Sequence, residues 1–110
     1  AQIVVVASQG NPSLSGTQRG LFDFSDADKD SLYKFSEITN RDPLDPYTQL
    51  EYVYQKLQQF SKGTPQQKAQ YTILTSTRPD LNQLRNALKA LLPGMSDTLI
   101  DRAINNMRRN

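Results

Sequence analysis

Apolar residues recur at steps of three and four from about residue 21 onward, which is the spacing of amphipathic helices. The clearest stripe comprises Tyr47, Leu50, Val53, Tyr54, Leu57 and Phe60. It follows Asp45-Pro46, where the acid suits an N-cap and proline suits the first helical position. We therefore predict a helix that begins at Pro46 and ends near Lys62-Gly63.

Weaker stripes predict further helices on both sides of this one. Before it, Ser25 or Asp26 can cap a helix whose stripe is Leu32, Phe35 and Ile38, and the prolines of residues 40–46 interrupt it. After it, Thr64 and Gln67 form a capping box that opens a short helix through residue 73, and residues 75–79 break that helix.

Two more stripes lie in the C-terminal part. The first is Leu81, Leu84, Leu88 and Leu91, and it ends at Pro93-Gly94. The second opens at Ser96-Asp97 and comprises Leu99, Ile100, Ala103, Ile104 and Met107. The sequence thus predicts an all-α bundle of about five short helices.

The first twenty residues have a different pattern. The β-branched run of residues 3–6 suggests one strand or an extended edge, and SQGNPSLSGTQRG further on is typical of a loop. We expect residues 1–20 to form an extended, partly mobile arm and residues 21–110 to form the helical domain. Because the chain opens with Ala1 rather than Met, we also expect it to be processed or excised from a longer chain.

Composition limits the chemistry. The 110 residues include no cysteine and no histidine, which excludes disulfides, thiolate zinc sites and any Ser-His or Cys-His arrangement. No apolar run approaches 18 residues, so we expect no transmembrane helix. We therefore expect no enzyme, and a protein partner or self-assembly as the chain's mode of action.

The net charge of +2 is unevenly distributed. Residues 1–51 carry four Lys/Arg and eight Asp/Glu, which gives a net charge of −4. Residues 52–110 carry nine Lys/Arg and three Asp/Glu, which gives a net charge of +6. This asymmetry can mark an acidic ligand site and a basic partner surface on one molecule, or two solvated faces.

The stretch DADKDSLYKFSE has the ligand spacing of a calcium loop. Counted from Asp26, the loop would supply Asp26, Asp28, Asp30, the carbonyl oxygen of Leu32 and the carboxylate of Glu37. FDFSDADKDSLYKFSEI resembles the EF-hand family, which implies Ca²⁺ binding at these five positions. Ser31 stands where that family has glycine, and a lone loop would bind weakly, with a Kd of roughly 10⁻⁵ to 10⁻³ M. In the other interpretation the acids simply cap a helix and complement its dipole.

The basic segment 91–109 has two further resemblances. It resembles a helix-hairpin-helix of DNA-binding proteins, which implies phosphate contacts by Gly94, Arg102, Arg108 and Arg109. Its L-P-G-M-S turn is also similar to a hairpin of the minor pseudopilins of type II secretion, where the turn serves assembly. An ordinary helical turn explains the same residues. DPLDPYTQLEYVYQKL resembles the C-terminal domain of retroviral capsids, although the Gln-Gly pair and the arginine of that family's homology region are missing.

These patterns lead to one expectation with an alternative. We expect a non-catalytic helical interaction or assembly module, with a possible low-affinity Ca²⁺ loop. The alternative is a nucleic-acid-binding domain that uses residues 91–109.

Overall fold

The computed structural model describes residues 3–4, 22 and 24–109, with the side chains of 108 and 109 left aside. In this part the chain forms α2 (Asp26–Thr39), α3 (Pro46–Ser61), α4 (Pro65–Thr75), α5 (Leu81–Leu91) and α6 (Asp97–Arg109). The described residues contain helices and no strand, which confirms the predicted all-α bundle of about five helices.

Helix boundaries follow local sequence signals. The N-caps of α2 to α5 are Ser25, Asp45, Thr64 and Asp80, and each side chain accepts a hydrogen bond from a backbone N–H of the first turn. Such a cap contributes about 1 kcal/mol of stability. The predicted capping box at Thr64 is also confirmed, because the Gln67 side chain accepts in return from the Thr64 N–H.

The end of α2 has its own signal. Asn40 adopts a left-handed conformation, with φ 55° and ψ 47°, and its N–H bonds back to the carbonyl oxygens of Ser36 and Glu37. Asparagine tolerates this conformation better than most residues do. The chain therefore turns sharply before Pro43 and Pro46.

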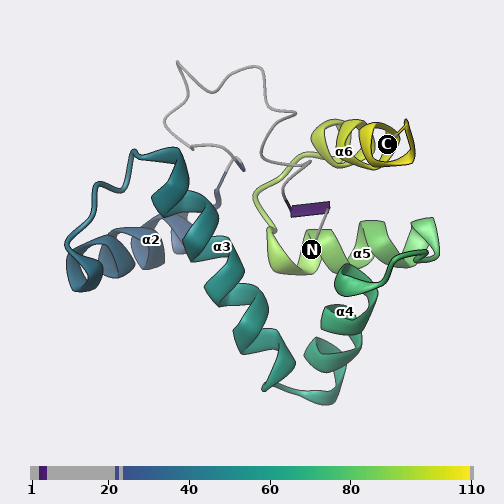
Figure 1. Cartoon of the computed structure of the whole chain (residues 1–110), viewed down its shortest axis with the longest axis horizontal. Coiled ribbons are helices and arrows are strands. Elements are labelled where there is room, and N and C mark those ends of the chain that lie inside the picture. The colour runs from purple at the N-terminus through teal and green to yellow at the C-terminus, as the bar shows by residue number, and fades with distance from the viewer. Residues whose placement is uncertain (1–2, 5–21, 23, 110) are drawn as a thin grey trace.

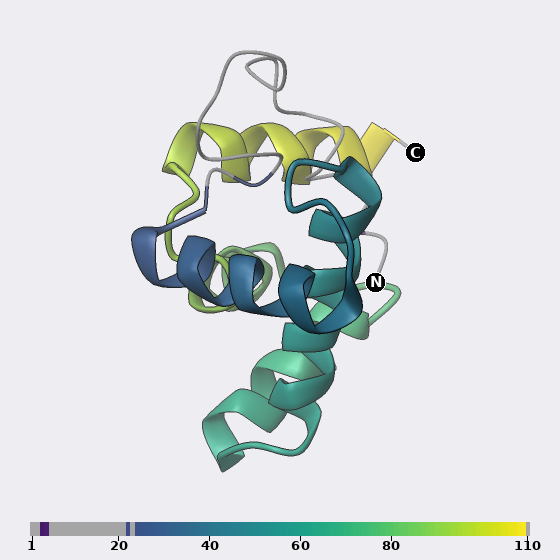
Figure 2. The same ribbon diagram turned by 90° about the vertical axis from the view of Figure 1, so that its left-hand side faces the viewer.

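Helices that follow one another in the chain pack against one another: α2 on α3, α3 on α4, α4 on α5 and α5 on α6 (Figure 1). Figure 2 shows the same helices turned by 90°, and in both views the turn between α3 and α4 lies at the bottom of the molecule, whereas α6 lies near the top. The bundle is thus built mainly from neighbours in sequence.

One hydrophobic core joins the helices. Its largest fully buried side chains outside the N-terminal segment include Leu84, Leu88, Leu91, Met95 and Ile100 of the α5–α6 region. Partly buried side chains such as Leu50, Ile73 and Met107 pack against this core. The predicted stripes of the last two helices are therefore largely confirmed.

Residues near the N-terminus also belong to this core. Ile3 and Val4 are 1% and 0% exposed, and Phe22 and Phe24 are buried with them. Ile3 and Val4 have helical backbone, so the predicted strand is not seen at these two residues. The other residues of the predicted arm, 1–2 and 5–20, lie outside the described residues.

Three residues of the predicted stripes are exposed. Ile38 is 85% exposed, Tyr47 is 77% exposed and Leu81 is 36% exposed. Ile38 and Tyr47 lie near the ends of α2 and α3, where no described element covers them. As a guide to burial, the predicted stripes were wrong for these residues. Periodicity shows which side of a helix is apolar, but burial also requires a neighbouring element opposite the residue.

Candidate protein-interaction site

The acidic stretch begins α2 and is helical over its whole length. Ser25 is the N-cap, and its Oγ accepts a hydrogen bond from the backbone N of Asp28 at 3.2 Å. Asp26 and Asp28 lie in the first turn, where carboxylates are favoured by the helix dipole. The capping interpretation of these residues is confirmed.

The structure does not bring the five predicted calcium ligands together. In a helix, Asp26 and Asp28 point about 200° apart around the axis, and Glu37 lies about 16 Å along the axis from Asp26. Asp28 is buried, whereas Asp26, Asp30 and Glu37 are exposed. Within the described ranges, no three acidic, histidine or cysteine residues are grouped so as to hold a metal ion. Calcium binding at this segment stays a prediction.

The Asp28 carboxylate instead joins α2 to α3. Its Oδ1 accepts hydrogen bonds from the Tyr52 hydroxyl at 2.8 Å and from Lys56 Nζ at 2.6 Å. The Asp28 side chain is 7% exposed and that of Lys56 is 20% exposed, so the ion pair is largely shielded from water. The Ser25 hydroxyl lies 3.3 Å from the other carboxylate oxygen. These contacts satisfy a charge that would be costly to bury alone.

Tyr52 is the titratable group most affected by this arrangement. Burial raises the pKa of its phenol far above the ordinary value of 10, and the hydrogen bond to Asp28 adds to the effect. The ring also contacts Phe24 and Phe35, with centroid separations of 5.8 and 6.1 Å. The sequence did not reveal this network. The only signal was that Tyr52 and Lys56 are four residues apart and so share one face of α3.

A groove of about 410 Å³ lies beside this network. Residues of α2 between Ala27 and Thr39 form one wall, and Tyr52, Gln55, Lys56 and Gln59 of α3 form the other. Phe35 and Ile38 are the large apolar residues of the α2 wall, and Lys34 adds a charge. The groove therefore combines an apolar surface with polar groups at fixed positions, as ligand sites usually do.

Exposed apolar side chains are concentrated in one stretch of the sequence, from the second half of α2 to the start of α3. Of the five large hydrophobic residues that are exposed in the described part of the chain, four lie within residues 33–47: Tyr33, Ile38, Leu44 and Tyr47 at 47, 85, 72 and 77% exposure. The fifth, Leu81, is the least exposed of them.

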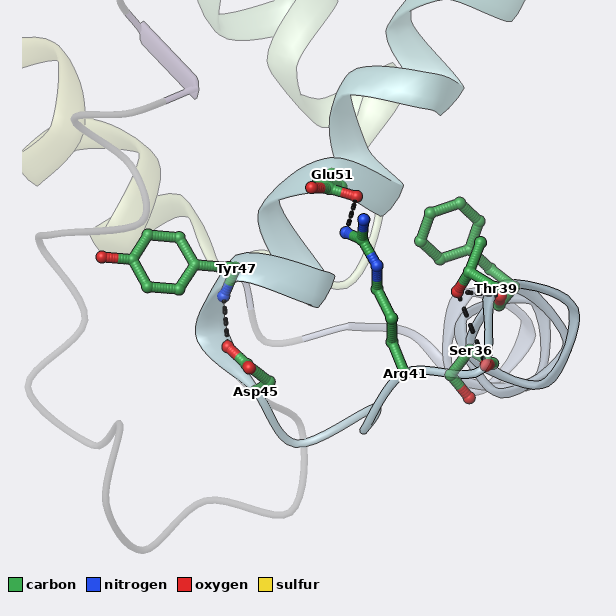
Figure 3. Close-up of polar contacts among 7 residues, drawn as sticks. Ser36, Thr39, Arg41, Asp45, Tyr47 and Glu51 are labelled. Atoms are coloured by element: carbon green, nitrogen blue, oxygen red, sulfur yellow. Dashed lines mark hydrogen bonds and ion pairs between the residues drawn. The ribbon is translucent and has the colours of Figure 1, made fainter.

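Polar contacts hold this connection in place (Figure 3). Arg41 pairs with Glu51 of α3, and the hydrogen-bonded pairing raises the pKa of Arg41 and lowers that of Glu51. The Asp45 side chain accepts from the backbone N of Tyr47 at 2.9 Å. Figure 3 shows the Tyr47 ring directed away from α2 and from the Arg41–Glu51 pair. The hydrogen-bonded backbone thus holds the Tyr47 side chain in an exposed position.

The predicted phosphate-binding hairpin is a tight turn between α5 and α6. The Met95 N–H donates to the Leu92 carbonyl oxygen at 3.1 Å, and the Leu99 N–H donates to Ser96 Oγ at 3.2 Å. Lys89 Nζ donates to the Met95 carbonyl oxygen at 2.6 Å. Two of the amides near the start of α6 are therefore already bonded within the chain.

The other residues predicted to contact nucleic acid lie on or near α6. Gly94 is half-buried in the turn, and Arg102 is exposed on α6 and interacts within the protein. Arg108 and Arg109 end α6, and their side chains lie outside the described residues. Nucleic-acid binding through residues 91–109 stays a prediction.

Comparison of the chain with protein families, with curated proteins and with solved structures finds no match. Among the described helices, none has both the length and the apolar character needed to cross a membrane.

Proposed function

We propose that this chain is a small, non-catalytic helical module that acts by binding protein, either another copy of itself or a different partner. The observation that carries the proposal is the concentration of exposed apolar side chains in residues 33–47, the end of α2 and the start of α3. Scattered exposed apolar residues are normal, but a concentration of them supports an interaction surface.

The chemistry of these side chains fits a protein partner. Covering a large apolar side chain contributes roughly 1.5–3 kcal/mol. Tyrosine is enriched at protein interfaces because its ring is apolar and its hydroxyl can still bond to water or to a partner. Tyr33 and Tyr47 are exposed in this way.

The non-catalytic part of the proposal rests on the available side chains. The sequence has no histidine and no cysteine, which removes the commonest general base and the strongest nucleophile. Tyr52, the buried group with a perturbed pKa, is bonded to Asp28 within the fold. Such a contact is explained by packing of α2 on α3.

Two measurements together test the proposal. Sedimentation velocity over a wide concentration range reports association with another copy, and selection from a random displayed-peptide library reports a different partner. We expect at least one to be positive, and the binding to weaken in the variants Leu44→Ser and Tyr47→Ser.

Leu81→Ser is the matched control, because Leu81 is exposed but lies outside residues 33–47. If the chain stays monomeric and selects no peptide, the proposed function is wrong. It is also wrong if Leu81→Ser weakens binding as much as the other two substitutions do.

A further inference from the structure

The groove between α2 and α3 has the dimensions of a helix-binding site. Its α2 wall runs from Ala27 to Thr39, which corresponds to about 18 Å along the helix axis. A partner helix of about 12 residues has the same length. Ala27, Ser31, Phe35 and Ile38 recur along this wall at helical spacing, so they present one continuous strip.

The strip contains side chains that a partner would cover. Phe35 is half-buried and packs against the core, whereas Ile38 is exposed at one end of the groove. A volume of about 410 Å³ lies within the range of ligand pockets. Amphipathic helices bind such grooves by inserting apolar residues spaced three and four apart.

The charged residues of the groove indicate the sign of the charge that a partner would carry. Three charged residues line it: Lys34, Lys56 and Asp28, for a net charge of +1. Lys56 and Asp28 are paired with each other, and Lys34 forms no ion pair with another residue of the described ranges. The acidic residues Asp30 and Glu37 on the same helix do not line the groove. An incoming carboxylate would therefore meet an exposed ammonium group.

We propose that this groove binds an acidic amphipathic helix of a partner protein, with apolar side chains against Phe35 and Ile38 and a carboxylate beside Lys34. This inference rests on the proposed function and specifies the surface and the class of partner. Gln55 and Gln59 on the α3 wall can donate further hydrogen bonds to carboxylate oxygens.

The probe is a fluorescein-labelled peptide of about 12 residues, with leucine and phenylalanine on one helical face and glutamate on the other. A matched peptide has glutamine in place of every glutamate. Fluorescence anisotropy should show roughly tenfold tighter binding of the glutamate peptide, and added salt should reduce the difference. Amide shifts should map binding to Ser31, Ile38, Gln55 and Gln59.

Variants at exposed positions separate the contributions without unfolding the protein. Lys34→Glu should weaken binding of the glutamate peptide roughly tenfold, and Lys34→Arg should retain it. Lys68→Glu is the matched control, since it makes the same charge change at an exposed position of α4. Ile38→Ser should weaken both peptides, and Leu81→Ser, at an exposed position outside the groove, should weaken neither.

The outcomes distinguish this inference from the proposed function. Equal binding of the two peptides, or shifts outside the groove, would refute the acidic-helix inference and leave the interaction module in place. If neither peptide binds, the inference is wrong, and the sedimentation and display measurements then decide the proposed function separately.

Discussion

Lys56 Nζ of α3 lies 2.6 Å from the Asp28 Oδ1 of α2, and the Asp28 side chain is only 7% exposed. Together with the hydrogen bond from the Tyr52 hydroxyl to the same oxygen, the pair places polar contacts directly between the two helices. It therefore fixes the relative position of the walls of the proposed groove.

Removing the Asp28 charge should destabilise the fold. Asp28→Asn leaves the Lys56 ammonium group without its counter-charge in a largely shielded site, and we expect a loss of about 1.5–3 kcal/mol. Urea unfolding measures this free energy. Asp30→Asn is the control, because Asp30 is exposed on the same helix and its substitution should cost less than about 0.5 kcal/mol. In a double-mutant cycle, Lys56→Met should partly offset Asp28→Asn, and strict additivity would contradict the contact.

The raised pKa of Tyr52 predicts a loss of stability in alkali. The unfolded chain releases this proton near the ordinary pKa of 10, whereas the folded chain retains it to higher pH. The contribution of Tyr52 is thus fully present below pH 10 and decreases as the pH rises above it. Comparing near-ultraviolet titrations of the wild type and Tyr52→Phe isolates the ionisation of the Tyr52 phenol. Above pH 10, the free energy of unfolding of the wild type should fall more steeply with pH than that of the variant. Parallel stability curves would contradict this prediction.

The calcium prediction can be tested directly. Binding by Asp26, Asp28, Asp30, Leu32 and Glu37 would require the first three turns of α2 to open and the Asp28–Lys56 contact to break. The spacing predicts saturable amide shifts confined to residues 26–37, with loss of helical signals there. Mg²⁺ serves as the control ion, since it rarely occupies an all-protein site of this kind. If about 5 mM Ca²⁺, a ceiling set roughly fivefold above the weakest loops, leaves these amides in place, the prediction is wrong.

The nucleic-acid alternative predicts a salt-dependent affinity for duplex DNA or heparin. Each phosphate contact that is lost should reduce the salt dependence, so the double variant Arg102→Gln/Arg108→Gln should elute from heparin at lower salt. The matched control Lys62→Gln/Lys68→Gln removes two charges at exposed positions elsewhere. The same elution shift in both variants would indicate a nonspecific charge effect, and no retention of the wild type would contradict the alternative.

The sequence alone determined where helices begin and end. Ser25, Asp45 and Thr64 cap helices as predicted, because a cap and the first turn it serves are neighbours in the chain. The prolines at 43, 46 and 79 lie outside helix interiors or at first helical positions for the same local reason.

Only the tertiary structure decided which side chains are buried and which acid has a partner. The alternating aspartates of α2 are equivalent in sequence, but Asp28 alone faces Tyr52 and Lys56 of α3 in the described structure. Ile38 and Tyr47 match apolar stripes and are nevertheless exposed, whereas Tyr52, outside the predicted stripe, is buried. Burial and charge pairing depend on what another helix places opposite a residue, and the residue's own position along the chain does not contain that information.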